Sequence, residues 1–219
     1  MAGSAKKSDS YDDAATKEAV VEASLPDAAF DGFTDAVLAK AAAKAGIEKT
    51  ELDRLFPEGA RSLIEAYSLS ADADMEKLLA EMNLGKMKIR ERIAAAVLAR
   101  FAILKPHKEA ARRAAATVSL PMHASLGAKL MYHTVDAMWR AVGDTSTDFN
   151  FYSKRGILAG VYGATLVRWF YDASEDERAT QDFLAARIEN VMQFEKFKAE
   201  AKKIFAKFPD LSAWMKPKG

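Results

Sequence analysis

The chain has 219 residues, of which half are hydrophobic, with a formal net charge of +1 and no cysteine. This length is enough to bury a sizeable core in one large domain or two small ones. The absence of cysteine excludes disulfides, cysteine-ligated zinc, iron–sulfur clusters and thiol catalysis, and the balanced charge provides no global field to hold a polyanion such as DNA.

Residue composition also predicts the fold class. The chain is rich in alanine, leucine, lysine and glutamate, which favour helices, and it contains only 11 glycines and six prolines. No convincing run of alternating residues is bounded by turn residues, so a sheet has little to form from. We therefore expect an all-α protein of about nine or ten helices, with no stretch near the roughly 20 apolar residues of a membrane-spanning helix.

The first quarter of the chain divides into a tail and a helical unit. Residues 1–13 are small, polar and charged, and we expect a disordered tail. The opening residues 1–23 lack the apolar segment of a secretory signal and the arginine-rich character of a transit peptide, which favours a bacterial cytoplasmic protein. Within residues 14–59, Thr34 can cap a helix that Gly46 closes, as expected of a helix-turn-helix.

Residues 60–193 are expected to form a helical core. The predicted helices run from about 61 to 82, 87 to 104, 106 to 120, 122 to 142 and 148 to 171. Ser174 and Glu177 then form a predicted capping box that opens a last long helix. The clearest apolar stripe, spaced by three and four residues, is Ile89, Ile93, Val97, Phe101 and Leu104.

Two segments resemble known families. The stretch from Gly32 to Leu63 follows the helix-turn-helix pattern of TetR-type repressors, with buried aliphatic residues around a glycine turn. A longer and more irregular motif begins at Trp139 and continues from Gly143 to Arg155 as GDTSTDFNFYSKR. It closely resembles the accessory-protein family of coenzyme Q (ubiquinone) biosynthesis.

This resemblance covers roughly residues 33–194. It implies a TetR-like fold that has stopped binding DNA, a homodimer, and a non-catalytic protein that holds an isoprenoid quinone or phospholipid and assists the demethoxyubiquinone hydroxylase. Gly156, Gly160 and Gly163 recur on one side of a predicted helix, although glycine there costs up to about 1 kcal/mol against alanine. We expect a close backbone approach at this face, within the domain or across a dimer axis.

The first candidate site is an apolar pocket among three helices that a TetR-like core would bring together. An isoprenoid offers little except apolar surface, whose burial contributes about 25 cal/mol per Å². The alternative for each single residue is a solid core. The predicted lipid-binding residues are Leu98, Phe101, Leu126, Leu130, Val135, Met138, Leu158, Val161, Tyr162, Thr165 and Trp169.

The second candidate site is the surface around residues 144–155. Aromatic residues beside arginine are typical interface anchors, and the resemblance implies that this region docks the hydroxylase. Phe151 departs from the animal members of the family, which carry tryptophan, and this puts the partner affinity in doubt. The alternative is an ordinary loop with Asp148 as an N-cap. The predicted partner-binding residues are Asp144, Asp148, Asn150, Phe151, Tyr152 and Arg155.

The third candidate site is an amphipathic C-terminal helix and tail over residues 194–219. A lysine-rich face opposite a phenylalanine-rich face is typical of a helix that lies on anionic lipid, here the inner membrane. A helix packed on its own domain, with a solvated basic side, is the alternative. The predicted membrane-contacting residues are Phe197, Lys202, Lys203, Ile204, Phe205, Phe208 and Trp214.

No catalytic motif is found in the sequence. The histidines His107, His123 and His133 are not spaced as a helical metal pair, and no glutamate is followed by histidine three residues later. No Gly-x-Ser-x-Gly, Walker or dinucleotide motif occurs. We expect no catalysis, no cofactor and no metal.

The alternative function is a TetR-type, ligand-responsive transcriptional regulator. A recognition helix normally presents basic and small polar residues to DNA. The corresponding segment here carries three acids, Glu48, Glu51 and Asp53, against two bases. This disfavours DNA binding, although acids at a helix start are also electrostatically favoured there.

Overall fold

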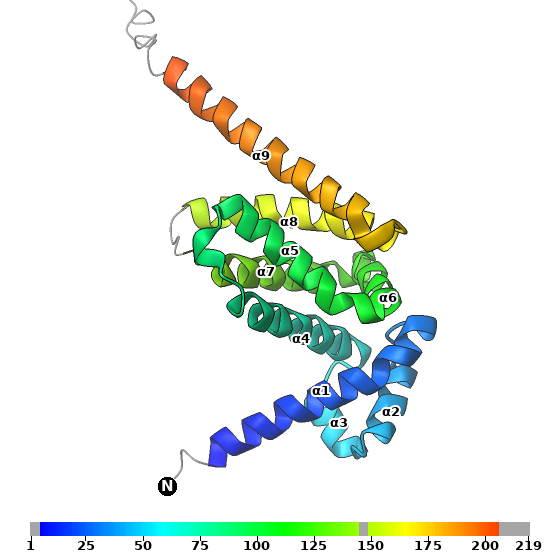
Figure 1. The fold of residues 1–219 in the computed structure, drawn as a ribbon. Coiled ribbons are helices and arrows are strands. Elements are labelled where there is room, and N and C mark those ends of the chain that lie inside the picture. Colours follow the sequence, from blue (N-terminus) through cyan, green and yellow to red (C-terminus); the bar gives the residue numbers. More distant parts are fainter. Residues whose placement is uncertain (1–4, 145–148, 206–219) are drawn as a thin grey trace, which may run out of the picture.

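The computed structural model describes residues 5–144 and 149–205, and every regular element in them is helical (Figure 1). The elements are α1 (Ala5–Asp31), α2 (Asp35–Lys44), α3 (Lys49–Leu55), α4 (Ala60–Ala80), η1 (Leu84–Lys86), α5 (Ile89–Leu104), η2 (Lys105–His107), α6 (Lys108–Val118), η3 (Pro121–His123), α7 (Ala124–Ala141), α8 (Phe149–Phe170), η4 (Glu175–Glu177) and α9 (Arg178–Phe205). The all-α prediction is confirmed. Within these ranges, no helix combines the length and apolar character needed to cross a membrane.

Helices α2 and α3 form the predicted helix-turn-helix. The backbone N–H of Val37 donates to the Thr34 hydroxyl at 3.2 Å, so Thr34 caps α2 as predicted. Gly46 ends that helix with φ of +71°, in the left-handed region that glycine enters without strain. Local capping chemistry thus fixes the turn between the two helices.

The start of the chain differs from the prediction. Residues 5–13, expected to belong to a disordered tail, are the first turns of α1. Asp13 in this stretch pairs with Arg54 of α3, which holds α1 against the helix-turn-helix. Helix α1 also packs against α4 and α6, so it joins the N-terminal unit to the core.

The core lies among α4, α5, α7 and α8; in Figure 1, α5 and α7 lie between α4 and α8. Helix α4 packs against both α5 and α7. The ring of Phe101 lies between those of Tyr162 and Trp169, with centroids at 5.8 and 5.0 Å. Four residues of the predicted stripe are buried, whereas Ile89, at the start of α5, is 48% exposed. These contacts make the core a continuous packed unit.

The junction of α8 and α9 corrects one predicted cap. Asp172, rather than a box of Ser174 and Glu177, accepts hydrogen bonds from the backbone N–H and hydroxyl groups of Ser174 and Thr180, at 2.6–2.9 Å. Glu177 has φ of +56° within the intervening η4 turn, and its carboxylate instead accepts from Trp169 Nε1 at 2.7 Å. The turn redirects Glu177 into the core, which spacing alone does not reveal.

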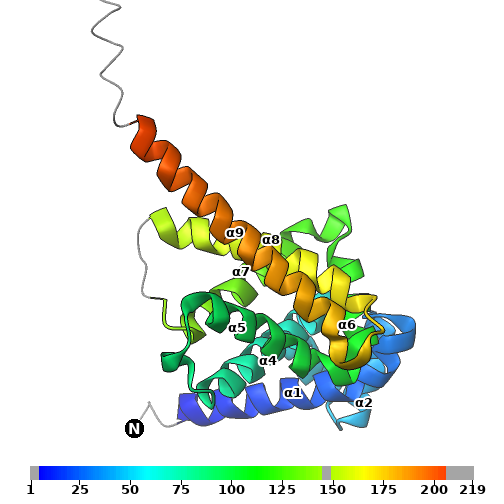
Figure 2. The same cartoon turned by 45° about the horizontal axis from the view of Figure 1, so that its top comes forward.

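Helix α9 begins on α8 and then leaves the body of the protein. In Figures 1 and 2 its C-terminal half extends away from the other helices. Leu184, near its start, is 1% exposed, while Phe194 and Phe197 are 62% and 70% exposed. The end of α9 therefore presents apolar rings to solvent in a single chain.

Candidate functional site

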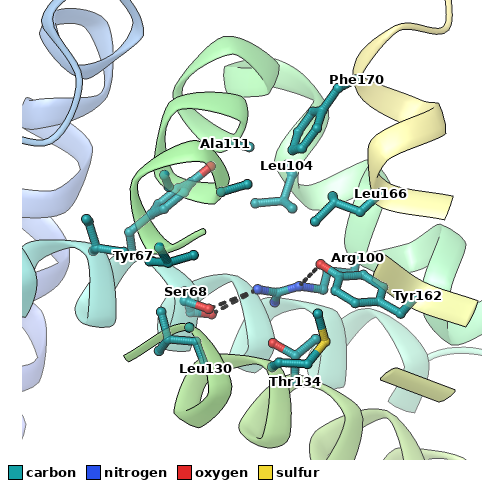
Figure 3. Close-up of a pocket in the computed structure, with 16 residues that line it drawn as sticks. Tyr67, Ser68, Arg100, Leu104, Ala111, Leu130, Thr134, Tyr162, Leu166 and Phe170 are labelled. Atoms are coloured by element: carbon teal, nitrogen blue, oxygen red, sulfur yellow. Dashed lines mark hydrogen bonds between the residues drawn. The ribbon is translucent and has the colours of Figure 1, made fainter. Parts of the chain in front are cut away.

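Side chains from α4, α5, α6, α7 and α8 line a cavity of about 100 Å³ (Figure 3). Most of its wall is aliphatic or aromatic, and α6 contributes small alanines. The lining residues are Ile64, Tyr67, Ser68, Arg100, Leu104, Ala111, Ala114, Ala115, Val118, Gly127, Leu130, Met131, Thr134, Tyr162, Leu166 and Phe170. An apolar space with a few convergent polar groups is the usual form of a small-molecule site.

One side of the cavity is polar because the buried Arg100 of α5 ends there. Its guanidinium pairs with Asp72 of α4, while Nε donates to the Tyr162 hydroxyl at 3.0 Å and Nη2 to Ser68 Oγ at 3.1 Å. The other oxygen of Asp72 accepts from the Thr134 hydroxyl at 3.2 Å. Burial raises the pKa of Asp72, while Arg100 and Thr134 act to lower it. The cluster joins α4, α5, α7 and α8 and balances one cation against one acid.

Two tyrosine hydroxyls add hydrogen-bond donors to this space. Tyr162 accepts from Arg100, so its own proton remains available. Tyr67 is only 8% exposed, and its hydroxyl has no hydrogen-bond partner among the described residues. Burial raises the pKa of both hydroxyls, so both stay protonated at neutral pH. Phe33 and Phe101 hold the two rings, at centroid distances of 5.3 and 5.8 Å respectively.

The observed lining differs from the predicted pocket. Leu130 and Tyr162 line the cavity as expected. The other nine predicted residues do not, because they lie on adjoining faces of the same helices. Eight of these are buried in the solid core and one is partly buried: Phe101, Leu126, Val135, Met138, Leu158, Val161, Thr165 and Trp169, with Leu98 partly buried.

The reason is the rotation of each helix. On α7 the cavity face carries Gly127, Leu130, Met131 and Thr134, which follow helical spacing but include small and polar residues. A search for the largest apolar residues selects the neighbouring face, which packs against other helices. On α8 the cavity face likewise differs from the predicted one, and it carries Tyr162, Leu166 and Phe170.

Sequence reasoning also missed the polar cluster. Arg100 lies three residues after Val97 and four before Leu104, so it occupies an otherwise apolar stripe of α5. A charge in such a stripe requires a buried partner. That signal identifies Arg100 as buried and paired, but Asp72 is 28 residues away and only the fold joins them.

The predicted partner-binding segment contains a second ion-pair network. Arg155 of α8 is 4% exposed, and its Nε lies 2.7 Å from Asp136 of α7. Arg155 also lies 3.5 Å from Asp144, whose side chain is 5% exposed and pairs with Lys154 at 2.7 Å. Trp139 Nε1 donates to the Lys154 carbonyl oxygen at 3.2 Å. Arg155 thus ties α8 to α7 through Asp136 and to the segment after α7 through Asp144.

Of the other predicted partner-binding residues, one is exposed and the side chains of the rest are not described. Tyr152, one turn into α8, is 69% exposed. Asp148 and the side chains of Asn150 and Phe151 lie outside the described part of the structure. Tyr152 is therefore the predicted contact that the structure places at the surface.

The predicted membrane site is described only at its beginning. Phe197 is exposed on α9. The backbone of Lys202, Lys203, Ile204 and Phe205 belongs to α9, but their side chains are outside the described residues, as are Phe208 and Trp214 entirely.

The recognition-helix position carries few unpaired cations. On α3, Arg54 Nε donates to Glu51 at 2.9 Å and its Nη1 donates to Asp13 at 2.9 Å. Lys49 lies 4.0 Å from Asp53. No group of three or more metal-ligating side chains occurs among the residues that are described.

Comparisons with known proteins bear on the family. The family model described as COQ9 matches residues 124–195. The chain is 32% identical over 168 residues to the mitochondrial ubiquinone biosynthesis protein COQ9 of Rattus norvegicus, covering 74% of this chain and 54% of that protein. It is 30% identical to the Homo sapiens protein of the same name, covering 74% and 52%. The chain thus spans about half the length of these curated relatives.

The relatives correct the predicted location. The COQ9 proteins of rat, human and Drosophila melanogaster are all named as mitochondrial, which contradicts the expectation of a bacterial cytoplasmic protein at an inner membrane. That expectation rested on the composition of the first residues alone.

A solved structure bears on the fold. A TetR transcriptional regulator from Nitrosomonas europaea superposes with a TM-score of 0.62 at 21% identity, covering 79% of this chain and 95% of that chain. At this identity the similarity establishes the fold alone, and it confirms the TetR-like prediction. The family assignment comes from the sequence comparisons: residues 124–195 match the COQ9 model and the chain is 30–32% identical to mammalian COQ9 proteins, so the chain contains a COQ9 domain.

Proposed function

We propose that this protein is a non-catalytic accessory protein of ubiquinone biosynthesis, which holds an isoprenoid quinone or another lipid and presents it to the demethoxyubiquinone hydroxylase at a membrane. The observation that carries the proposal is the apolar cavity among α4–α8, in a chain similar to proteins named for ubiquinone biosynthesis. Burial of isoprenoid surface in such a cavity supplies affinity without any catalytic group.

The cavity must widen to hold a prenyl tail. Its volume of about 100 Å³ is well below the roughly 300–1,000 Å³ of pockets that enclose larger ligands. Helix α6 is the wall best suited to move, because it packs mainly on α1 and only lightly on α7 and α8. Its lining face carries Ala111, Ala114 and Ala115, whose small side chains interlock little with a neighbour. We therefore place tail entry at α6.

The hydroxylase surface is proposed near the start of α8. Tyr152 is exposed there, and exposed tyrosines are frequent interface anchors. The buried network of Arg155 with Asp136 and Asp144 fixes the α7–α8 junction behind it. In this proposal the network positions the surface and does not itself contact the partner.

A homodimer is proposed through α8. Cβ atoms added at Gly156 and Gly160 would meet nothing within 4 Å, so packing within one chain does not explain these glycines. Val167 and Tyr171 continue the exposed side of α8 at 59% and 73% exposure. A second copy would cover this apolar face, and light scattering of Gly160→Arg against the unmodified protein tests the interface.

Membrane contact is proposed through the end of α9. Phe194 and Phe197 are largely exposed there, where the helix extends away from the body. Lysines follow in the sequence at 202 and 203, as expected for a helix that lies on anionic lipid. Co-sedimentation with anionic vesicles, before and after removal of residues 196–219, tests this contact.

DNA binding is not part of the proposed function. The bases on α3 have acidic neighbours, so few positive groups remain to neutralise phosphates. A gel shift of a defined operator at physiological salt would favour the regulator alternative instead.

The central experiment is mass spectrometry of lipid that co-purifies in the absence of detergent. We expect quinone or phospholipid in the unmodified protein, and much less in Ala115→Leu, which fills the cavity from α6. The matched control is Ala116→Leu, because Ala116 is exposed on the same helix. Protein without extractable lipid, or equal loading of both variants, would contradict lipid binding in this cavity.

A further inference from the structure

The cavity holds a buried hydroxyl that the fold does not use. Tyr67 is more than nine-tenths buried and lines the cavity, yet its hydroxyl has no partner among the described residues. An unsatisfied buried polar group destabilises a protein, so such a group often marks a functional role. The structure therefore contains an available donor inside an apolar space.

A second donor lies across the same space. Figure 3 shows Tyr67 on one side of the cavity and the Arg100–Tyr162 hydrogen bond on another. Since Tyr162 accepts from Arg100, it can donate its own proton to a ligand. The two hydroxyls come from α4 and α8 and lie on different sides of the cavity.

The charge of the cavity selects against anions. Among the residues that line it, Arg100 alone is charged, and Asp72 already pairs with it. A phosphate or carboxylate would therefore enter an apolar space with no unpaired cation, which is strongly unfavourable. A neutral oxygen atom avoids this penalty and can accept from both hydroxyls.

The volume of the cavity is also consistent with a small, neutral head group. About 100 Å³ accommodates a ring-sized group without displacement of the cavity wall. A ring bound beside Tyr67 and Tyr162 also meets the aliphatic side chains of Leu104 and Leu166. The tail of such a molecule leaves toward α6.

We propose that this cavity binds the neutral, oxygen-bearing ring of a quinone-like molecule, with the hydroxyls of Tyr67 and Tyr162 as hydrogen-bond donors from different sides. The inference rests on the proposed function, because it needs the cavity to hold a lipid. It goes beyond that function by assigning the head group to the interior and by excluding phosphate-bearing lipid heads from it.

The test compares three soluble probes with the same short tail: pentyl-1,4-benzoquinone, pentylbenzene and pentyl phosphate. Calorimetric titration of the unmodified protein should give the tightest binding for the quinone and no advantage for the phosphate over pentylbenzene. Tyr67→Phe should weaken quinone binding roughly three- to tenfold, as expected for one lost hydrogen bond, and leave pentylbenzene binding unchanged. Tyr132→Phe is the control, since Tyr132 is 46% exposed on α7, and it should change neither.

The outcomes separate this inference from the proposed function. If pentylbenzene binds and the quinone has no advantage, the head-group assignment is wrong and the apolar cavity stands. If neither binds, both proposals fail. Tighter binding of pentyl phosphate would instead identify an anion site.

Thermal unfolding supplies a second check. Because Tyr67→Phe removes a hydroxyl that has no partner among the described residues, this variant should unfold at or above the temperature of the unmodified protein. Marked destabilisation would mean that the hydroxyl has a structural role and overturn the inference.

Discussion

Arg100 and Arg155 are two buried arginines in different regions of the core. Each is 4% exposed, and each pairs with aspartate from a neighbouring helix. Arg100 lines the cavity with an unpartnered tyrosine hydroxyl nearby, whereas Arg155 is not among the lining residues and pairs with both Asp136 and Asp144. Burial and ion pairing alone therefore do not distinguish a ligand site from a structural joint.

The difference lies in what remains unsatisfied around each charge. At the α7–α8 junction, two carboxylates pair with the guanidinium, and the indole of Trp139 is also hydrogen-bonded. At the cavity, the Tyr67 hydroxyl remains without a partner among the described residues. A structural network uses the donors that it buries, while a binding site keeps donors available for a ligand.

The largest expected effect is at the structural joint. Arg155→Met removes the buried cation shared by Asp136 and Asp144, although Arg140 and Lys154 still pair with them. We therefore expect a loss of about 3 kcal/mol in the free energy of unfolding, the lower end for a broken buried pair, measured by urea denaturation. Binding of pentylbenzene to the remaining folded protein should be unchanged. Arg140→Met is the matched control, because Arg140 lies 3.1 Å from the same Asp136 but its side chain is 61% exposed, and it should cost less than about 1 kcal/mol. Equal costs would show that the junction is not the buried joint described here.

A smaller effect is expected at the wall of the cavity. A Cβ added at Gly127 would lie 2.7 Å from the Val118 carbonyl oxygen, which is backbone and cannot rotate away. Gly127→Ala should push α6 from α7, reduce stability by about 1–3 kcal/mol and alter pentylbenzene affinity.

The control for this wall is Gly85→Ala, because a Cβ there meets nothing within 4 Å. It should leave both stability and binding nearly unchanged. If Gly127→Ala behaves in the same way, then α6 tolerates displacement without any effect on the cavity.

The α8–α9 junction provides a third comparison, with a pH dependence. Hydrogen bonds from Ser174 and Thr180 hold the pKa of Asp172 below its ordinary range. The ionised carboxylate therefore stabilises the folded protein fully above the unfolded pKa of about 3.9, and this stabilisation is lost as the pH falls through the lower folded pKa. Asp172→Asn should cost about 1 kcal/mol at pH 7, as for a lost helix cap. Unfolding measured from pH 7 to pH 3 should show the difference from the unmodified protein shrinking below about pH 4. A difference that is constant over this range would exclude the ionised carboxylate as its source.

The smallest change in stability is expected when the cavity ion pair is replaced as a whole. Asp72→Leu together with Arg100→Met removes both charges, and such exchanges are often neutral or stabilising. We expect stability within about 1 kcal/mol of the unmodified protein, with loss of the preference for pentyl-1,4-benzoquinone over pentylbenzene. A retained preference would show that the polar cluster is not needed for head-group binding.

Some features of the fold were predictable because they depend on local chemistry. The cap at Thr34 and the glycine turn at Gly46 need only a few neighbouring residues. The stripe through Ile93 and Phe101 follows from helical periodicity. The failed capping box at Ser174 marks the limit of this reasoning, since the η4 turn redirects Glu177 toward Trp169.

The helical class, most of the helix spans and the family motif could be predicted because they depend on the order and spacing of nearby residues. Tertiary packing sets the rotation of each helix, and with it which residues line the cavity and which fill the core. It also brings Asp72 to Arg100 and Asp136 to Arg155, pairs separated by 28 and 19 residues. The physical reason is that a buried charge requires a partner but does not specify which one, and the packing of the helices makes that choice.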